Sequence, residues 1–548
     1  MRILAFNTAH DASVCSLNDG EIEFFSKEER LTRKKRDKNP FKSLELYHSL
    51  NFGQIDYVVY CNPSSENKEE VQYKNLYKTY FMKKFGVNEN QILSLTHHIC
   101  HAFLSFINSE FDDALVFVVD RNGTHFCIGD DPVARESESV YVFNKKTRYR
   151  EIYKSFWLSD NHYSKEQIRN RIKNIFPSPE IKIHNAYGIV KVYEAATTLI
   201  GQHPLENGKT MGLASYGEDK NYVKLFLDNT PIENYFDHVS GKVIFNNLNE
   251  KIVKHVDEND YQFYANQAKH VQIETQRAVL DLIKKYVDCT KIKNVCLVGG
   301  YALNIVANNY YLKNLPDVNF YFEPNADDSG ISIGATMAAY RRITNKWSKP
   351  LTNNFYHYYN VDEQIQSGNI SSIDEICELL IAQKSVAVFE GSPEAGPRAL
   401  GHRSILFDPR NIDAKKIINK IKKREWYRPF AGVILESYFD QYFETFGLKS
   451  SPYMTVNFDC KEIAKRVVPG IIHVDDTCRI QTINSGFLFD LLQLFYEKTG
   501  CPMLLNTSFN LAGEPLVQTK ADAIKTFENS ELDAVYFVEE GRILTKSK

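Results

Sequence analysis

Residues 2–26, RILAFNTAHDASVCSLNDGEIEFFS, are the stretch from which the fold can be predicted. They predict a strand, a polar turn that carries His10 and Asp11, and a second strand. The Asp19-Gly20 pair is a hairpin signal, and a third strand follows it. The chain therefore opens on three short strands, with two polar side chains at the first turn.

A similar arrangement returns at 114–129, ALVFVVDRNGTHFCIG. A buried strand there ends in Asp120, and a glycine-containing turn leads into another strand. Two such halves facing each other across a cleft are the plan of the actin-like ATPase fold, whose strand-turn-strand elements hold metal and phosphate. We therefore expect an N-terminal α/β domain of that kind, built on a weak internal repeat.

Two strand-to-helix junctions follow, at 294–312 and 318–343. In the first, the Gly299-Gly300 pair lets the backbone approach a ligand at a helix N-terminus, which is a ready site for an anion. In the second, the Asp327-Asp328 pair lies just before a helix, where N-capping is its simplest role.

The helix predicted around LTHHICHAF, 95–103, carries two histidines four residues apart. His97 and His101 share one helix face, whereas His98 is turned away by roughly 100°. Both imidazoles can therefore reach one point, as metal ligands do. Histidine pairs of this spacing are also common by chance, so polar residues near a core remain the alternative until a carboxylate partner is found.

Length and composition indicate an ordinary globular protein of more than one domain. The 548 residues exceed the size at which one hydrophobic core stops growing. We expect no membrane span and no signal peptide, since the chain has no long apolar run and its amino terminus soon turns polar. Ten cysteines without a C-x-x-C pair favour reduced thiols and a cytoplasmic location. A net charge of −3 gives no global attraction to nucleic acid or membrane.

Residues 348–372 have turn formers and little apolar periodicity, and predict a linker between a domain at 1–347 and an α/β domain at 373–548. Within the first domain, ten Lys/Arg face four Asp/Glu between Lys145 and Lys182, interleaved with aromatic residues. That mixture suits a contact with nucleic acid, although a solvated lobe is the commoner explanation.

The second domain carries four separate basic or amide-rich clusters, of which GSPEAGPRALGHRSILFDPR at 391–410 is the most informative. A loop punctuated by Gly and Pro presents fixed arginine donors to an oxyanion rather than building a core. The other clusters lie at 422–436, around Arg479, and at 504–515. Together they indicate a polyanionic ligand such as a nucleotide plus a phosphate, with surface salt bridging as the alternative.

These stretches, with HDAS, EERLTRKKRD, HHICHA, GKTMGLASYG, GGYALN, REWYRPFA and LLNTSFN, make the chain resemble the NodU/CmcH family of O-carbamoyltransferases, which includes the tobramycin carbamoyltransferase. The resemblance runs nearly end to end. It implies an N-terminal domain similar to TsaD, with the actin-like ATPase fold, and a C-terminal YrdC-like α/β domain, with a separate reaction in each.

The resemblance also implies roles for particular residues. One divalent metal, iron(II), would be held by His97, His101, Asp120 and Asp328. His10, Asp11 and Lys35 would be catalytic residues near the acceptor and a carbamoyl adenylate, with His10 as general base and a pKa suited to neutral pH; holding the turn is its alternative role. The sites for ATP and carbamoyl phosphate would comprise Gly299, Gly300, Asn304, Arg398, His402, Arg403, Lys423, Arg424, Arg428, Arg479, Asn506 and Ser508.

The chain departs from the family pattern directly after Asp120. Members commonly continue Gly-x-Gly-Glu, whereas this chain has Arg121-Asn122-Gly123-Thr124-His125. In the family pattern, glycines at this turn let the backbone come close to a nucleotide. This chain has other residues there, so that close approach is altered.

The activity implied is ATP-dependent O-carbamoyl transfer from carbamoyl phosphate, through carbamoyl adenylate, to an acceptor hydroxyl. The acceptor cannot be predicted from the sequence: a small molecule or sugar comes first, and a nucleotide or DNA base such as 5-hydroxymethylcytosine stays open, as does a homodimer. The alternatives are threonylcarbamoyl transfer to tRNA and a non-catalytic module that binds nucleotide or nucleic acid.

Overall fold

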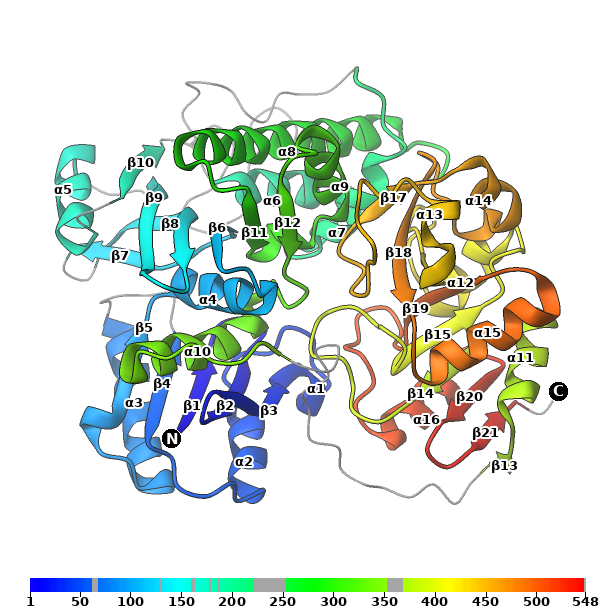
Figure 1. Cartoon of the computed structure of the whole chain (residues 1–548), viewed down its shortest axis with the longest axis horizontal. Coiled ribbons are helices and arrows are strands. Elements are labelled where there is room, and N and C mark those ends of the chain that lie inside the picture. The colour runs from blue at the N-terminus through cyan, green and yellow to red at the C-terminus, as the bar shows by residue number, and fades with distance from the viewer. Residues whose placement is uncertain are drawn as a thin grey trace. The chain divides into compact units, whose positions relative to one another are not determined.

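A computed structural model describes most of the chain, in two compact units. The described residues are 1–61, 68–128, 131–158, 163–176, 179–184, 188–220, 253–351 and 368–546. One unit combines Met1–Phe24 with Lys38–Leu351, and the other combines Phe25–Asp37 with Thr352–Lys548 (Figure 1). Most of the predicted linker, residues 352–367, lies outside the described residues.

The first unit opens on a five-stranded sheet of order β3-β2-β1-β4-β5. β1 is antiparallel to β2 and parallel to β4, which is parallel to β5. The strands are β1 (Arg2–Asn7), β2 (Ser13–Asn18), β3 (Glu21–Lys27), β4 (Tyr57–Cys61) and β5 (Ile92–Leu95). The three strands predicted from the opening stretch are therefore confirmed.

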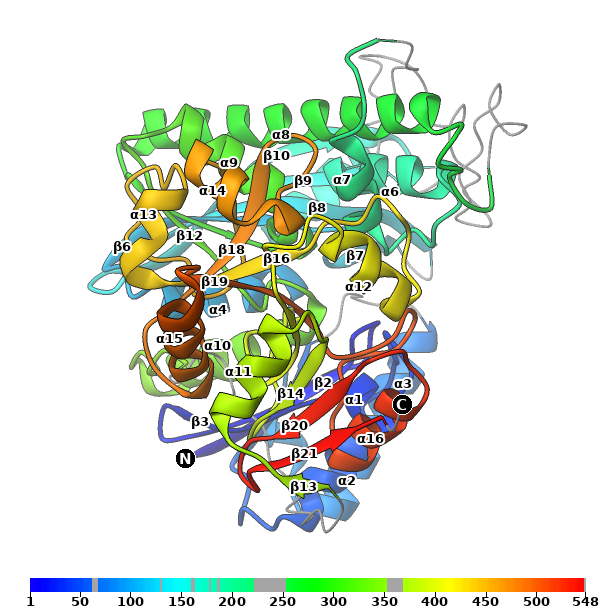
Figure 2. The ribbon, with the colours of Figure 1, turned by 90° about the vertical axis from the view of Figure 1, so that its right-hand side faces the viewer.

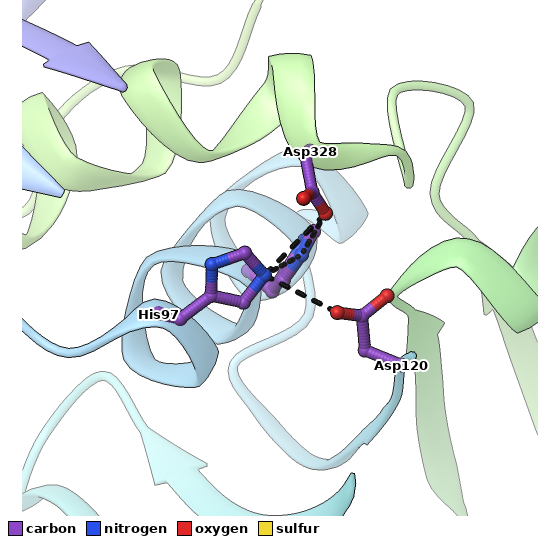
Figure 3. A group of neighbouring side chains, drawn as sticks. His97, Asp120 and Asp328 are labelled. Carbon is purple, nitrogen blue, oxygen red and sulfur yellow. Dashed lines mark hydrogen bonds and ion pairs between the residues drawn. The ribbon is translucent and has the colours of Figure 1, made fainter. Parts of the chain in front are cut away.

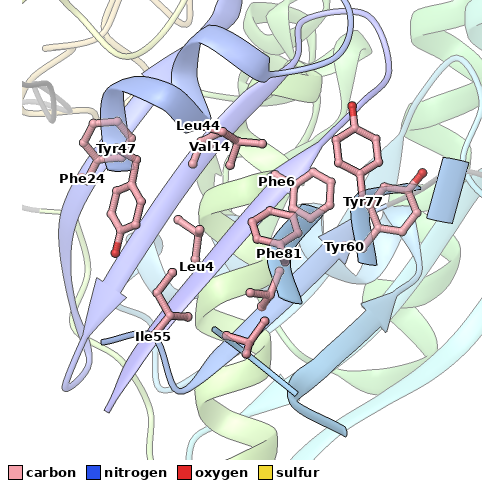
Figure 4. Close-up of a cluster of buried hydrophobic side chains, with 12 residues drawn as sticks. Leu4, Phe6, Val14, Phe24, Leu44, Tyr47, Ile55, Tyr60, Tyr77 and Phe81 are labelled. Atoms are coloured by element: carbon pink, nitrogen blue, oxygen red, sulfur yellow. The ribbon is translucent and has the colours of Figure 1, made fainter. Parts of the chain in front are cut away.

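Aromatic and aliphatic side chains cover one face of this sheet. Leu4 and Phe6, two positions apart on β1, point to the same side and pack against Tyr47 of α2 (Phe41–Ser49) and Phe81 of α3 (Lys68–Phe85), as Figure 4 shows. Burying such side chains contributes roughly 1.5–3 kcal/mol each relative to exposure, which fixes the register of β1 and hence the turn that follows it.

A second sheet of order β10-β9-β8-β6-β11-β12, with β7 paired to β8, repeats the first. β6 is antiparallel to β8 and parallel to β11, which is parallel to β12. The run β9-β8-β6-β11-β12 thus matches β3-β2-β1-β4-β5 strand for strand, so the internal repeat and the actin-like fold are confirmed. The strands are β6 (Asp113–Val119), β7 (His125–Ile128), β8 (Asp131–Asn144), β9 (Arg148–Leu158), β10 (Glu180–His184), β11 (Asn294–Val298) and β12 (Asn319–Phe322).

Two helices lie between the sheets, α4 (His97–Ser109) and α10 (Ile331–Thr344) (Figure 1). They contact each other, and α4 contacts β6 and β11 while α10 contacts β1, β2 and β4. A Cβ on Gly334 would lie 1.8 Å from the carbonyl oxygen of Cys100, so the close approach of the two helices requires glycine. The remaining helices of this unit are α5 (Lys165–Ile175), α6 (Ile189–Leu199), α7 (Asn207–Ala214), α8 (Gln262–Thr290) and α9 (Ile305–Asn314).

The second unit is a mixed nine-stranded sheet of order β13-β21-β20-β14-β15-β19-β16-β18-β17. α11 (Ile373–Ile381) and α15 (Phe487–Thr499) pack together and contact the sheet (Figure 2). The strands are β13 (Asn369–Ile370), β14 (Val386–Phe389), β15 (Arg403–Phe407), β16 (Ala431–Leu435), β17 (Asn457–Asp459), β18 (Thr477–Ile483), β19 (Met503–Ser508), β20 (Ala534–Phe537) and β21 (Arg542–Thr545); the other helices are α12 (Ala414–Lys422), α13 (Phe439–Tyr442), α14 (Glu462–Val467) and α16 (Lys520–Glu528).

The segment Phe25–Asp37, which contains α1 (Glu28–Thr32), belongs to this second unit although it lies near the amino terminus. Arg30 donates to the carbonyl oxygens of Glu394 (3.4 Å) and Gly396 (3.2 Å), and Arg33 donates to that of Leu516 (2.6 Å). The predicted domain ranges are consecutive in sequence, whereas the two units are not, because these arginines join distant parts of the chain.

The basic segment from Lys145 to Lys182 divides between strands of the second sheet and α5, on which Lys165, Arg169, Arg171 and Lys173 are exposed. Lys154 is fully buried and pairs with Glu136, and the rings of Tyr153, Phe156 and Trp157 are buried as well. Buried rings cannot stack on bases, so these positions do not form the aromatic nucleic-acid surface that the sequence allowed. Among the described residues, no helix is long and apolar enough to cross a membrane.

Candidate active site

Four side chains from separate elements converge between the two sheets of the first unit. His97 and His101 occupy the first turns of α4, Asp120 follows the last residue of β6, and Asp328 begins a short 3-10 turn directly before α10. Figure 3 shows His97, Asp120 and Asp328 pointing toward one another. The structure therefore brings together all four residues that the resemblance implied as metal ligands.

The distances suit a shared ion. The Nε2 atoms of His97 and His101 are 3.2 Å apart, and His97 Nε2 lies 3.2 Å from Asp120 Oδ2 and 3.4 Å from Asp328 Oδ1. Ligand atoms about 2.1 Å from one ion and roughly at right angles lie about 3.0–3.4 Å apart. One ligand atom from each residue lies within 4.8 Å of the others, and two imidazoles with two carboxylates suit a divalent first-row metal.

The protein surrounds these groups with little alternative hydrogen bonding. All four residues are buried, and the Nδ1 atoms of both histidines have no hydrogen-bond partner among the described residues. Burial lowers the pKa of His97, but the carboxylates of Asp328 and Asp120 outweigh burial and raise this pKa well above its usual value. The rings are thus held through their Nε2 atoms, in a pocket of negative charge that favours a cation.

Backbone and amide contacts fix the two aspartates. The Gly300 N–H donates to Asp120 Oδ1 at 3.0 Å. Asn7, a buried residue at the end of β1, donates from Nδ2 to the carbonyl oxygens of Asp328 (2.8 Å) and Asp11 (3.1 Å). Sequence analysis missed Asn7, although a polar residue closing an apolar strand was a signal that could have identified it.

The expected anion site at the glycine pair is altered by these contacts. The Gly300 N–H already serves Asp120, and the pair leads into the short 3-10 turn Gly300–Leu303. Asn304 caps α9 through Ala307 N–H (3.1 Å) and exchanges two hydrogen bonds with Gln272. Gly300 therefore positions a ligand residue, and the Asn304 side chain is engaged within the protein.

His10 and Asp11 lie at the rim of the cluster. His10 Nε2 is 3.4 Å from Asp328 Oδ2, and its Nδ1 is 2.9 Å from Asp11 Oδ2. Burial lowers the pKa of His10, but Asp328 and Asp11 raise it to about 9, above the neutral range that the sequence suggested, for this arrangement of charges. Two flanking carboxylates stabilise the protonated ring.

The turn after Asp120 is clamped to α4. Thr124 Oγ1 accepts from the His97 N–H (3.3 Å), and Glu136 Oε2 accepts from the Thr124 N–H (3.2 Å). His98, turned away from the face of α4 that carries His97 and His101, contacts Ser139 Oγ through Nδ1 at 2.8 Å. This arrangement fixes the helix that carries two candidate ligands against the turn that carries a third.

We expect Gly123→Ala to weaken metal binding about 10- to 100-fold, as loss of a supporting contact around a metal commonly does. A Cβ on Gly123 would lie 2.5 Å from His98 Nε2 and 2.6 Å from Glu136 Oε2, so the clamp must shift. Metal content after dialysis against a chelator measures the effect. Gly208→Ala is the control, because its Cβ meets nothing within 4 Å; equal retention by both variants would contradict the prediction.

A second cluster, of cations, lies within the other unit. Burial lowers the pKa of Arg479, and the charges of Arg398 and Arg428 lower it further. Arg424 is affected in the same way, first by burial and then by Arg428 and Arg479. Arg479 Nε is buried without a hydrogen-bond partner among the described residues. The predicted arginines thus lie near enough to repel one another, as in a site that binds an anion.

Lys422, which lies in the predicted basic run but was not assigned to the ATP and carbamoyl phosphate sites, belongs to this cluster. Burial and then Arg424, Arg428 and Lys35 lower its pKa well below the usual value, and its Nζ donates to Asn510 O and Oδ1, both at 3.0 Å. Lys35 thus lies in the second unit, near Lys422. The neighbouring Lys423, which the sequence favoured, is exposed at the left-handed C-cap of α12.

Other predicted residues of this unit hold its framework. The buried Arg403 guanidinium donates to the carbonyl oxygens of Glu390 (2.6 Å) and Gly391 (2.8 Å), so it fixes the loop rather than presenting these donors to a ligand. His402 Nδ1 lies 2.7 Å from the carbonyl oxygen of Ser392. Asn506 Nδ2 donates to Gln481, and Ser508 Oγ to Asn510.

Comparison with known proteins identifies the family. Residues 67–337 match the model described as the carbamoyltransferase N-terminus, and residues 377–543 match the carbamoyltransferase C-terminus. An uncharacterised protein of Methanocaldococcus jannaschii is 30% identical over 97% of this chain and 98% of its own length. The nodulation protein NolNO of Sinorhizobium fredii is 27% identical over 96% of this chain and 78% of its own. Since the two matches follow one another along the chain and each covers a unit with its own cluster of charged side chains, the protein belongs to the carbamoyltransferase family and is a carbamoyltransferase.

Proposed function

We propose that this carbamoyltransferase is ATP-dependent and works in two stages. In the second unit, water hydrolyses carbamoyl phosphate to carbamate and inorganic phosphate, and the carbamate is joined to the α-phosphate of ATP. Pyrophosphate leaves, and carbamoyl adenylate forms. In the first unit an acceptor hydroxyl then attacks the carbamoyl carbon, which releases AMP and loses the hydroxyl proton.

The observation that carries this proposal is the group of partly buried cations around Arg479, with Lys422 fully enclosed among them. Burial is the largest influence that lowers the pKa of Lys422, Arg424 and Arg479. The charges of neighbouring cations come next and lower each pKa further. Concentrating like charges out of water is costly unless an anion with several charges joins them. Carbamoyl phosphate and a triphosphate are such anions, and arginine presents paired donors that match phosphate oxygens.

In the first unit, His97, His101, Asp120 and Asp328 would hold a divalent metal. When bound, such an ion supplies Lewis-acid stabilisation of negative charge that develops during transfer. Asn7 and the Gly300 N–H keep the aspartates in place for it.

His10 is the proposed base for the acceptor hydroxyl. Asp11 orients its ring through the 2.9 Å contact at Nδ1, which leaves Nε2 toward the cluster. A divalent cation among the ligands offsets the charge of Asp328, the strongest of the charges that hold a proton on His10. The pKa of His10 is then lower than in the metal-free protein. Its ring is therefore unprotonated, and able to accept the hydroxyl proton, at a lower pH.

A small molecule with a hydroxyl is the proposed acceptor. The segment 145–182, which the sequence left as either a nucleic-acid contact or a solvated lobe, has three of its aromatic rings buried and Lys154 paired inside the sheet. This favours a small-molecule acceptor over a base in DNA.

The proposal is tested by incubating the metal-loaded protein with ATP and carbamoyl phosphate and measuring pyrophosphate and phosphate. We expect pyrophosphate release that depends on carbamoyl phosphate, and AMP release that increases with a suitable acceptor. Candidate acceptors, among them an aminoglycoside, free 5-hydroxymethyldeoxycytidine and DNA containing that base, are then screened by mass spectrometry for a gain of one carbamoyl group. Pyrophosphate release that is indifferent to carbamoyl phosphate would rule out the adenylate route.

A further inference from the structure

Arg121 replaces a glycine of the family pattern and directly follows Asp120, on the turn between β6 and β7. Its side chain is 32% exposed, and its Nε donates to Glu194 Oε1 at 2.5 Å. Within the described part of the chain, its two terminal nitrogens have no hydrogen-bond partner. The end of the guanidinium is therefore available to a ligand.

The second carboxylate oxygen of Glu194 accepts a hydrogen bond from another cation. Lys191, one turn earlier on α6, places Nζ 3.0 Å from Glu194 Oε2, and both side chains are buried. Two cations thus share one carboxylate, which leaves one positive charge without a counter-charge from Glu194. Burial lowers the pKa of Lys191, Glu194 opposes this, and Arg121 lowers it again.

The excess positive charge extends to the neighbouring groups. Burial lowers the pKa of His125 to about 3, and Arg135, His97, Arg121 and Lys191 all act in the same direction. Arg121 directly follows Asp120, one of the four candidate ligands, which places this corner beside the candidate metal cluster.

We propose that Arg121 and Lys191, joined through Glu194, form an anion-binding subsite beside the metal centre that takes a phosphate or carboxylate group of a substrate. The free end of the guanidinium offers two parallel N–H donors, the geometry that matches these groups. The anion has two sources, the phosphate of the nucleotide intermediate or an anionic group on the acceptor. The position of the subsite beside the metal centre rests on the proposed function, whereas its binding of an anion does not.

The test uses the full chain carrying Arg398→Ala and Arg479→Ala, so that the cation cluster of the second unit does not bind the probe. Inorganic phosphate is titrated at low ionic strength by calorimetry. We expect Arg121→Gln to weaken binding about 10- to 100-fold, the range for hydrogen bonds to charged groups. Glu194→Gln should strengthen binding, because it removes the competing carboxylate while both cations remain.

Opposite effects of Arg121→Gln and Glu194→Gln on phosphate affinity distinguish a binding site from a structural ion pair. If Arg121 only stabilised the fold, both substitutions would act in the same direction. Arg2→Gln is the matched control, since its Nε donates to Glu23 at 2.6 Å in the same unit; it should leave phosphate binding unchanged. Equal or same-direction effects of Arg121→Gln and Glu194→Gln would overturn the proposal, as would absence of phosphate binding before either change.

Two further titrations identify the source of the anion. If the nucleotide supplies it, AMP displaces inorganic phosphate and Arg121→Gln weakens AMP binding. If the acceptor supplies it, a hexose 6-phosphate displaces inorganic phosphate while AMP binds alongside. Arg121→Gln in a chain with an intact second unit should release pyrophosphate at the rate of the unsubstituted protein. Failure of the subsite would therefore change anion binding alone, whereas failure of the adenylate route would change pyrophosphate release.

Discussion

His97→Ala and His101→Ala are each expected to lose stoichiometric metal and carbamoyl transfer, while pyrophosphate release in the presence of carbamoyl phosphate continues. Each substitution removes one of two imidazole nitrogens that lie 3.2 Å apart beside two carboxylates. The remaining groups are a smaller and weaker set of ligands. Metal analysis of the purified variants and product mass spectrometry measure the two losses separately.

A matched control separates the loss of a ligand from the loss of a buried histidine. His270 is also buried in the first unit, where its Nε2 lies 2.9 Å from Glu274. His270→Ala should keep its metal and its transfer activity, even if its thermal stability falls. Stoichiometric metal in both His97→Ala and His101→Ala would show that the cluster is not the metal site.

Arg479→Ala and Arg398→Ala should lower the rate of carbamoyl adenylate formation by at least about 100-fold. Removing one donor from a preorganised anion site commonly costs 10²–10³ in turnover. Arg479 Nε is buried without a partner among the described residues, and the charges of Arg398 and Arg428 are the ones that act on it most strongly after burial. Release of pyrophosphate that depends on carbamoyl phosphate measures the step directly.

The control is an arginine of the same unit whose charge is already matched. Arg410 donates to Asp408 at 2.6 Å and lies over the ring of Phe495. Arg410→Ala should affect stability more than pyrophosphate release. Wild-type pyrophosphate release by both Arg479→Ala and Arg398→Ala would remove the second unit from the proposed reaction, while their metal content should stay unchanged in either case.

The metal cluster shows how far local sequence patterns reach. The helical spacing of His97 and His101 placed two imidazoles on one face, and the end of a buried strand placed Asp120 at a turn. Asp328 could be assigned only to a helix start from the local sequence, where its neighbour Asp327 is the residue that caps the turn. Its role as a ligand came from the family resemblance, because the contact with α4 spans more than two hundred residues of chain.

The second unit shows where residue type was misleading. Lys422 and Lys423 are indistinguishable as neighbours in a basic run, but the left-handed end of α12 buries one and exposes the other. Arg403 and Arg479 are both conspicuous in the sequence. The structure engages the first with backbone carbonyls and leaves Nε of the second without a partner among the described residues.

The sequence by itself determined the strand-turn-strand repeat, the helical histidine pair, the basic clusters and the family, because these depend on short-range periodicity and on motifs read along the chain. Tertiary structure decided which charges meet. Three features depend on contacts between segments far apart in sequence. They are the join of residues 25–37 to the second unit, the clamp of Thr124 on the His97 N–H, and the sharing of Glu194 by Arg121 and Lys191. Since a charged group's pKa and its ability to bind an anion or a metal are set by burial and by its neighbours in space, these properties could be assigned only in the folded chain.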